Sequence, residues 1–266
     1  MVHKSIIALF ALFCINSTLF AQNNVPANVS MQVEEFTYKK PSVGKIGLSV
    51  LVAASDPTTL LIPAKEMTPH INEAIAATPT YIPWVSAYAG GGSADYTLSG
   101  RITNAETKRG DNKPMCIITV DALLTDNRTG KTVAEKRVYG SGMGFGTFTD
   151  MEGIKAMACK NLTYHLCEFV FEALPITGTV LEKGVEKTNG DVNERQCYVD
   201  LGEKHGVYKD LVLYVTDGSK YKGELKVKEV MGDDICACKI TKGSSFIEKA
   251  LESGSKIIVT SKPKKM

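Results

Sequence analysis

The sequence contains few of the residues and patterns from which catalytic sites are built. Only four histidines occur in 266 residues, and His3 lies in the extreme N-terminal segment. A hydrolase needs a nucleophile, a base and an orienting group, and no G-x-S-x-G turn is present. A G-x-G-x-x-G match starting at Gly142 would require glycine where Thr147 stands. We therefore expect no enzymatic activity and no cofactor, and we interpret the glycine-rich stretch 140–146 as a plain flexible connection.

The sequence also has little excess of either positive or negative charge. Lysine and arginine number 31 against 29 aspartates and glutamates, which gives a formal net charge of +2. The only dense cationic run is at 262–265, and we expect it to be a solvated C-terminus. Nucleic-acid-binding proteins carry a basic patch or stripe, so this composition predicts no nucleic-acid partner.

Long apolar runs are absent after the N-terminus. Lys4 precedes an apolar stretch at 6–15, and Ala21 provides a small residue before Gln22. The apolar stretch is too short to span a bilayer, so residues 1–21 are predicted to be a cleaved secretory signal. Cys14 follows Phe13, whereas a lipid-attachment cysteine requires a small residue before it, so lipidation is disfavoured. We expect an exported protein that is periplasmic or associated with the outer membrane.

Six cysteines follow the predicted signal, and they do not form an obvious disulfide framework. Cys159 and Cys167 lie eight residues apart on one predicted helix, about 12 Å along its axis and beyond disulfide reach. Buried free thiols are one interpretation, and a single bridge from Cys197 to Cys236 or Cys238 is the alternative. A metal held by the last three with a histidine is disfavoured, because C-x-C on a strand is not zinc-site spacing. The six are Cys116, Cys159, Cys167, Cys197, Cys236 and Cys238.

The stretch 94–174 organises the N-terminal part. Strands are predicted at 94–102, 116–124 and 132–139, with turn residues at 126–130. A helix is predicted from Thr149, with Glu152 completing a capping box, and it ends at Leu174 before Pro175. Its apolar stripe is Met151, Ile154, Ala158, Leu162, Leu166, Phe169 and Val170. This order predicts a mixed sheet with helices packed on it.

Two further elements are predicted upstream. The apolar run at 45–52 has the character of a central strand covered on both faces. Residues 63–77 show helical periodicity, although Pro69 lies inside them and offers an alternative helix start with Thr68 as N-cap.

The C-terminal part has a different sequence pattern, with short apolar runs separated by turn residues. Short strands are predicted at 176–187, 196–201, 211–216, 222–230, 235–241 and 256–261, with a helical turn at 244–251. Such spacing favours a small barrel of the SH3 or OB type. The predicted class is therefore α+β, with a signal at 1–21, a mixed-sheet domain at 22–174 and a small β-barrel domain at 176–262.

Two resemblances support this division. The strand at 94–102, ADYTLSGRI, resembles the "aDyvl.G.I" strand of the CsgG-like family, which includes the curli secretion channel and the lipoprotein activators of penicillin-binding proteins. The segment 120–131, VDALLTDNRTGK, resembles the strand and turn that follow in that family. Segments 196–202, 206–210 and 221–230 are similar to the C-terminal domain of flagellar assembly protein T.

These resemblances imply non-catalytic roles in scaffolding, secretion or activation of a partner. We therefore expect a cell-envelope accessory or assembly protein that acts through protein–protein interaction. Peripheral association with the outer membrane is compatible with this role. The alternative is a ring-forming, self-associating component of a secretion channel. Aromatic residues dominate binding hot spots, so the candidate partner-binding residues are Met143, Phe145, Phe148, Tyr81 and Trp84. The alternative for Tyr81 and Trp84 is an ordinary place in the core, and for the loop aromatics it is packing on the neighbouring helix.

Overall fold

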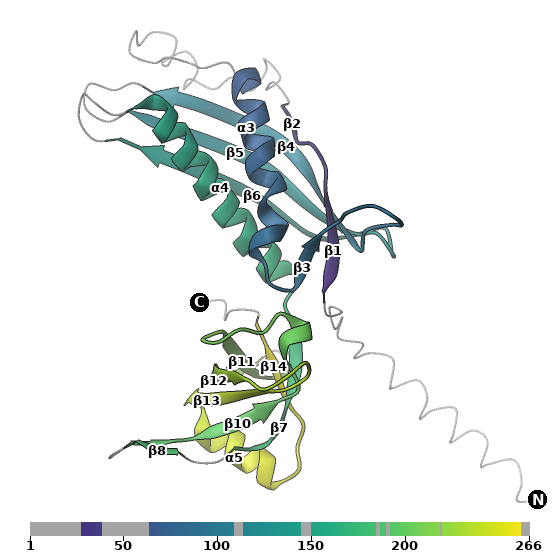
Figure 1. Cartoon of the computed structure of the whole chain (residues 1–266), viewed down its shortest axis with the longest axis vertical. Coiled ribbons are helices and arrows are strands. Elements are labelled where there is room, and N and C mark those ends of the chain that lie inside the picture. Colours follow the sequence, from purple (N-terminus) through teal and green to yellow (C-terminus); the bar gives the residue numbers. More distant parts are fainter. Residues whose placement is uncertain are drawn as a thin grey trace, which may run out of the picture.

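A mixed sheet with two helices on one face and a closed six-stranded barrel make up the described part of the computed structural model (Figure 1). The structure describes residues 28–38, 64–108, 114–144, 150–184, 187–189, 192–218 and 220–261. The predicted α+β class, a mixed sheet followed by a barrel, is confirmed at this level. The apolar run predicted as a central strand at 45–52 lies outside the described residues.

The sheet combines parallel and antiparallel pairs. β1 pairs in parallel with β3 and β4, β2 pairs in parallel with β4, and β4, β5 and β6 form an antiparallel meander. The strand order is β3-β1-β4-β5-β6, with β2 beside β4. The bounds are β1 Val29–Val33, β2 Thr37–Tyr38, β3 Val85–Ala87, β4 Tyr96–Lys108, β5 Met115–Asp126 and β6 Lys131–Met143. The three strands predicted in this region are confirmed, and each is longer than predicted.

Alternation along β5 explains how the sheet receives its helices. Every second side chain from Cys116 to Leu124 is buried, because these residues face the helices. The opposite face carries Asp121, whose carboxylate accepts hydrogen bonds from Arg101 of β4 and Arg137 of β6. No described element covers that opposite face (Figure 1).

The first helix, α3, spans Ala64–Ala76 and contains Pro69. The predicted helix over 63–77 is confirmed, and the alternative start at Pro69 is wrong. Proline has no N–H to donate to the carbonyl group four residues earlier in the helix. Because Pro69 is exposed, that carbonyl group lies on the solvent side of the helix. Met67, Ile71 and Ile75 are buried on the opposite side and hold the helix on the core.

The second helix, α4, spans Met151–Ala173 and crosses the meander. Its N-cap is Asp150, whose carboxylate accepts a hydrogen bond from the Glu152 N–H at 3.0 Å. The predicted capping box with Thr149 is therefore corrected: Asp150 provides the cap, and its negative charge also suits the helix N-terminus. The predicted stripe is confirmed, with Ile154, Ala158, Leu162, Leu166, Phe169 and Val170 buried and Met151 packed at its margin. In the described part of the chain, no helix is long and apolar enough to cross a membrane.

Glycines in β6 allow α4 to lie very close to the sheet. A Cβ atom on Gly140 would lie 2.3 Å from the Ala158 carbonyl oxygen, and one on Gly142 would lie 2.1 Å from that of Ile154. Both glycines therefore belong to a strand–helix contact that no side chain could occupy. This corrects the interpretation of 140–146 as a flexible connection, since β6 continues to Met143.

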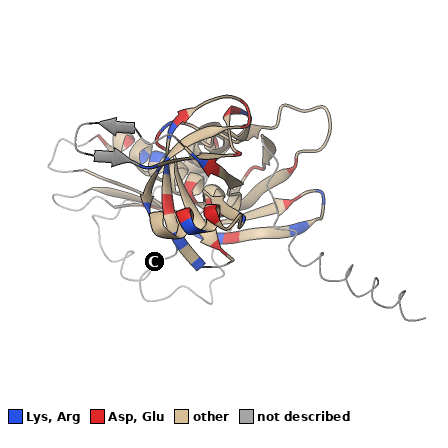
Figure 2. Ribbon diagram, turned by 90° about the horizontal axis from the view of Figure 1, so that it is seen from below, with Lys and Arg blue, Asp and Glu red and all other residues tan. Residues whose placement is uncertain are grey.

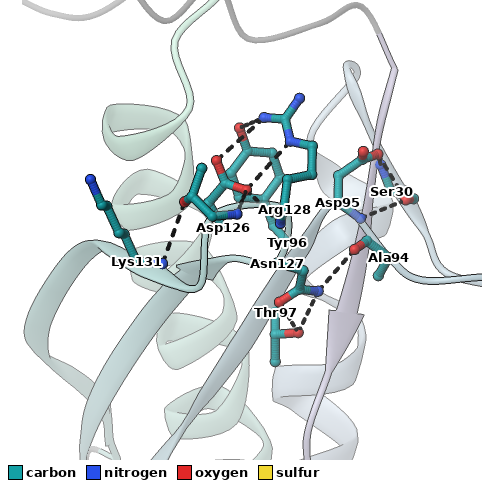
Figure 3. Close-up of polar contacts among 10 residues, drawn as sticks. Ser30, Ala94, Asp95, Tyr96, Thr97, Asp126, Asn127, Arg128 and Lys131 are labelled. Carbon is teal, nitrogen blue, oxygen red and sulfur yellow. Dashed lines mark hydrogen bonds and ion pairs between the residues drawn. The ribbon is translucent and has the colours of Figure 1, made fainter.

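The motif residues of the β4 start and the β5–β6 turn form one hydrogen-bonded cluster (Figure 3). The Asp95 carboxylate accepts from the Ser30 N–H and hydroxyl, both at 2.9 Å, which ties β1 to β4. The Asn127 amide donates to the Ala94 carbonyl at 2.9 Å. The Arg128 guanidinium lies over the Tyr96 ring, 5.7 Å from its centre. These contacts fix the turn and the strand ends, so the motif has a structural role here.

The C-terminal barrel closes in the order β10-β13-β12-β11-β14-β7. All six predicted strands are confirmed, as β7 Thr177–Lys183, β10 Gln196–Val199, β11 Val212–Asp217, β12 Lys220–Val230, β13 Cys236–Lys242 and β14 Ile257–Thr260. The predicted helical turn is the helix α5, Ser244–Glu252. A short hairpin of β8, Lys187–Asn189, and β9, Val192–Glu194, branches from the barrel. Closure leaves the barrel without open strand edges.

Trp84 connects the two units. Its indole N–H donates to the Leu174 carbonyl at 2.8 Å, and its ring packs on Phe171 of α4 with centroids 4.6 Å apart. A Cβ atom on Gly206, in the barrel, would lie 2.7 Å from the Trp84 nitrogen. Gly206 has a φ of 71° and follows a short 3-10 turn, η3, at Glu203–His205. A side chain is therefore excluded where the barrel meets the sheet domain.

Candidate functional site

A hollow in the described surface runs along α3 and α4 as a groove, with a volume of about 1120 Å³. Each of the two helices forms one wall. The segment that follows α3, with Tyr81 and Ile82, closes one end of the groove, and Tyr208 of the barrel lies at the same end. The lining residues are His70, Glu73, Ala74, Ala77, Tyr81, Ile82, Glu152, Lys155, Ala156, Cys159, Lys160, Thr163, Tyr164, Cys167, Glu168, Phe171, Glu172 and Tyr208. We refer to this feature as the α3–α4 groove.

A second stripe on α4, adjacent to the buried stripe, forms the floor of the groove; Thr163 in it is buried and the other three residues are half-buried. It consists of residues at four-residue steps, namely Cys159, Thr163, Cys167 and Phe171. The floor is completed by the small residues Ala74 of α3 and Ala77, which follows α3. This stripe was the signal in the sequence that could have indicated the groove, because α4 has apolar residues on two faces. We did not predict it.

Two hydrogen bonds set the registry of the helices. The Thr163 hydroxyl donates to the Ala74 carbonyl at 2.8 Å, and the Cys167 thiol donates to the Thr78 carbonyl with 3.6 Å between sulfur and oxygen. Since Ala74 is opposite Thr163 and Thr78 is opposite Cys167, the two helices run in the same direction. The groove therefore has one end near Glu152 and the other near Phe171.

Three tyrosines lie at or towards the second end and remain exposed. Tyr81 lies in the 3-10 turn η2, Thr78–Tyr81, and is 67% exposed; Tyr164 of α4 is 61% exposed. Tyr208 comes from the barrel and is 46% exposed. Exposed tyrosines beside an apolar floor are typical of protein-binding surfaces, because they bury a large area at low entropic cost.

The thiols of the groove are chemically quiet. Burial raises the pKa of Cys159 and of Cys167 to about 11. The thiolate is the nucleophilic form, and it is scarce at neutral pH when the pKa is this high. Both side chains therefore act as small apolar groups, so the floor favours contact rather than covalent chemistry.

The rim of the groove is charged and predominantly acidic. Four carboxylates line it, from Glu73, Glu152, Glu168 and Glu172, against the two ammonium groups of Lys155 and Lys160. Glu152 is paired with Lys155 at 2.6 Å, and Glu172 is paired with Lys136 of β6 at 3.3 Å. Elsewhere on the molecule, Lys and Arg are interspersed with Asp and Glu (Figure 2).

The predicted partner-binding residues are dispersed in the structure. Trp84 is fully buried, so its assignment as a surface anchor is corrected: it fills the core and links α4 to the barrel. Tyr81 is exposed and lines the groove. Met143 ends β6 and is 41% exposed, away from the groove lining. Phe145 and Phe148 lie outside the described residues.

The other sulfur cluster lies in the barrel core. Cys197, Cys236 and Cys238 are fully buried free thiols, and the Cys236 and Cys238 sulfurs are 3.6 Å apart. The Nδ1 atom of His205, the histidine considered as a fourth ligand, instead accepts a hydrogen bond from the Gly202 N–H. Within the ranges that the structure describes, no three His, Cys, Asp or Glu side chains are placed to hold a metal ion.

Comparison with known proteins gives folds of limited similarity. No protein-family model matches the sequence, and no curated protein matches it. A Xanthomonas campestris protein of the DUF330 family aligns with 54% of this chain and 82% of its own, at 16% identity and a TM-score of 0.36. The PelC dodecamer protein of Paraburkholderia phytofirmans covers 53% of this chain and 91% of its own, at 17% identity and a TM-score of 0.32. A lipoprotein of Neisseria meningitidis covers 54% and 99%, at 15% identity and a TM-score of 0.24.

Proposed function

We propose that this chain is an exported, non-catalytic accessory protein of the bacterial cell envelope that docks a protein partner in the α3–α4 groove. The observation that carries the proposal is the groove itself: a long, half-buried apolar floor bordered by three exposed tyrosines. Its volume of about 1120 Å³ lies at the upper end of the ~300–1,000 Å³ of ordinary small-molecule pockets, and its lining extends along α4 from Glu152 to Glu172. A protein surface fits such a site better than a small substrate does.

The proposal takes the sheet domain as CsgG-like and the barrel as similar to the C-terminal domain of flagellar assembly protein T. The motif residues behind the first resemblance, such as Asp95 and Asn127, form a connected cluster at the sheet end. A motif used to build a fold supports common architecture, whereas it says nothing about a reaction. The groove then supplies the interaction that such an accessory protein needs.

Site-specific photocrosslinking in native envelopes tests this function. A photoreactive amino acid replaces Ala156, which is exposed inside the groove, and in the control it replaces Met157, which is 47% exposed and outside the groove lining. We expect the Ala156 probe to give an adduct with one envelope protein, identified by mass spectrometry of the crosslinked peptide. The Met157 probe should not give that adduct. A folded protein that yields no adduct from either position contradicts the proposal.

Self-association into a ring is the second candidate, and the open face of the sheet favours it. A ring needs two different surfaces on each subunit that fit one another. The groove is one surface, and the face bearing Arg101, Asp121, Arg137 and Tyr139 is another on the opposite side of the sheet. Adducts between copies of this chain, joining position 156 to β4, β5 or β6, would select this candidate.

A further inference from the structure

We infer that the groove receives an amphipathic α-helix of about five to six turns with basic flanks, supplied by the protein partner. This inference rests on the proposed function and adds the chemistry of the partner. It is carried by three properties of the groove, namely the nature of its walls, its dimensions and the charge of its rim.

The walls decide between a helix and an extended peptide. Both walls are α-helices, whose backbone N–H and C=O groups are already paired within each helix. An extended peptide laid on the apolar floor would find no strand edge to pair with, and its own backbone groups would be desolvated without partners. A helix satisfies its backbone internally and presents only side chains, so it suits this floor.

The dimensions fit one helix. The lining of α4 runs from Glu152 to Glu172, which corresponds to about 30 Å of helix axis at 1.5 Å per residue. Small side chains contribute to the lining between the walls, namely Ala74 and Ala77 in the floor and Ala156 on α4. Small residues let a third helix approach closely, with its larger apolar side chains filling the trough.

The rim sets the charge of the partner. The four rim carboxylates outnumber the two rim lysines; three of the four are paired within the chain, and Glu73 forms no ion pair within the described residues. A helix whose apolar stripe is flanked by lysine or arginine would place those groups beside the carboxylates. The same rim disfavours an anionic lipid, whose acyl chain could otherwise occupy an apolar trough.

Binding of synthetic helices to the full chain, measured by fluorescence anisotropy, tests the inference. The probe is a labelled 21-residue peptide with a leucine and alanine stripe flanked by lysines. One control peptide replaces every lysine by glutamate, and another scrambles the order of the lysine peptide. We expect the lysine helix to bind about tenfold more tightly than the glutamate helix at low salt, with the difference shrinking in 1 M salt. The scrambled peptide, which has no stripe, should bind at least as weakly as the glutamate helix.

A matched pair of variants places the binding. Ala156→Arg puts a long cationic side chain into the groove, and Met157→Arg adds the same side chain one residue away, outside the lining. Both positions are exposed on α4 and arginine is a good helix former, so both variants should fold, which thermal melts check. We expect Ala156→Arg to weaken the lysine helix about tenfold and Met157→Arg to change it less than about twofold.

Several results would overturn the inference while leaving the proposed function intact. Equal binding of the lysine and glutamate helices would remove the charge argument, and equal binding of the scrambled peptide would remove the helix. A crosslink from position 156 to an extended or acidic segment of a partner would do the same. Binding of uncharged vesicles that is lost in Ala156→Arg, with no peptide bound, would instead assign the groove to lipid and remove both the inference and the proposed function. Absence of any protein adduct from position 156 would instead remove the proposed function itself.

Discussion

The close approach of α4 to β6 predicts a large effect for a single methyl group. In Gly142→Ala the new Cβ would lie 2.1 Å from the Ile154 carbonyl oxygen and 3.0 Å from the Ala158 nitrogen. Ordinary contacts of this kind begin near 3.4 Å, so the helix and strand must separate by roughly 1 Å. Overpacking of this type costs ~1–3 kcal/mol, against a gain of ~0.4–1 kcal/mol from the less flexible unfolded chain. We expect a net loss of about 1–2 kcal/mol in unfolding free energy.

Replacement of a second glycine, in the first turns of α4, should change the stability in the opposite direction. Gly153 lies in the first turns of α4, is exposed, and would place a Cβ atom no closer than 3.9 Å to the Asp150 carboxylate. Gly153→Ala should therefore stabilise the protein by about 0.5 kcal/mol, because alanine is the better helix former and nothing is displaced. Both variants change one glycine to alanine, so composition and unfolded-state effects are matched.

Urea unfolding followed by Trp84 fluorescence measures both changes. Trp84 is the only tryptophan, and it is fully buried next to α4, so its emission reports on the sheet domain. The midpoint should fall for Gly142→Ala and rise for Gly153→Ala at unchanged slope. Equal or higher stability of Gly142→Ala would refute the close packing of β6 on α4. It would also weaken the placement of the groove, since the position of α4 defines one of its walls.

Two further predictions test the junction and the open face of the sheet. Trp84→Phe leaves the buried Leu174 carbonyl without its hydrogen-bond donor, and we expect the free energy of unfolding to fall by about 2 kcal/mol. Circular dichroism should show this as a lower melting temperature. An unchanged melting temperature would contradict the linking role of Trp84. Hydrogen bonds from Arg137 and then Arg101 hold the pKa of Asp121 below its usual value. Its contribution should therefore be present above the unfolded pKa of ~3.9 and disappear as pH falls through the lower folded pKa. Asp121→Asn should be less stable than the wild type by at most ~1 kcal/mol at pH 6, since the pair is solvent-screened, and the difference should shrink as the pH falls below the unfolded pKa of ~3.9; a pH-independent difference would refute this origin.

Sequence periodicity was sufficient for most of the secondary structure, because local side-chain patterns and turn chemistry act over a few residues. Alternation in β5 and the turn at 126–130 gave the meander, and the stripe from Ile154 to Val170 gave the face of α4 that is buried. The barrel strands followed from short apolar runs between turn residues. The cap of α4 was misplaced by one residue, since Thr149 and Asp150 are both suitable N-caps and local sequence does not choose between them.

The candidate site depended on contacts between distant segments. Tyr81 is exposed beside the groove, yet Trp84, three residues later, is buried because Leu174 and Gly206 meet it from far along the chain. Aromatic type alone does not distinguish an anchor on the surface from a residue in the core. The apolar floor around Cys167 was missed for the same reason, since a second stripe on a helix can face a neighbour or solvent.

The sequence by itself determined the order and type of the elements, since hydrophobic period and turn residues are properties of neighbouring positions. It also determined that the chain carries no recognisable catalytic pattern. Only the tertiary structure explains why glycine is needed at positions 140 and 142, because a Cβ atom there would collide with the backbone of α4. It alone brought α3, α4 and the barrel residue Tyr208 around one groove, since the packing of segments far apart in the sequence sums many weak contacts that no local pattern encodes.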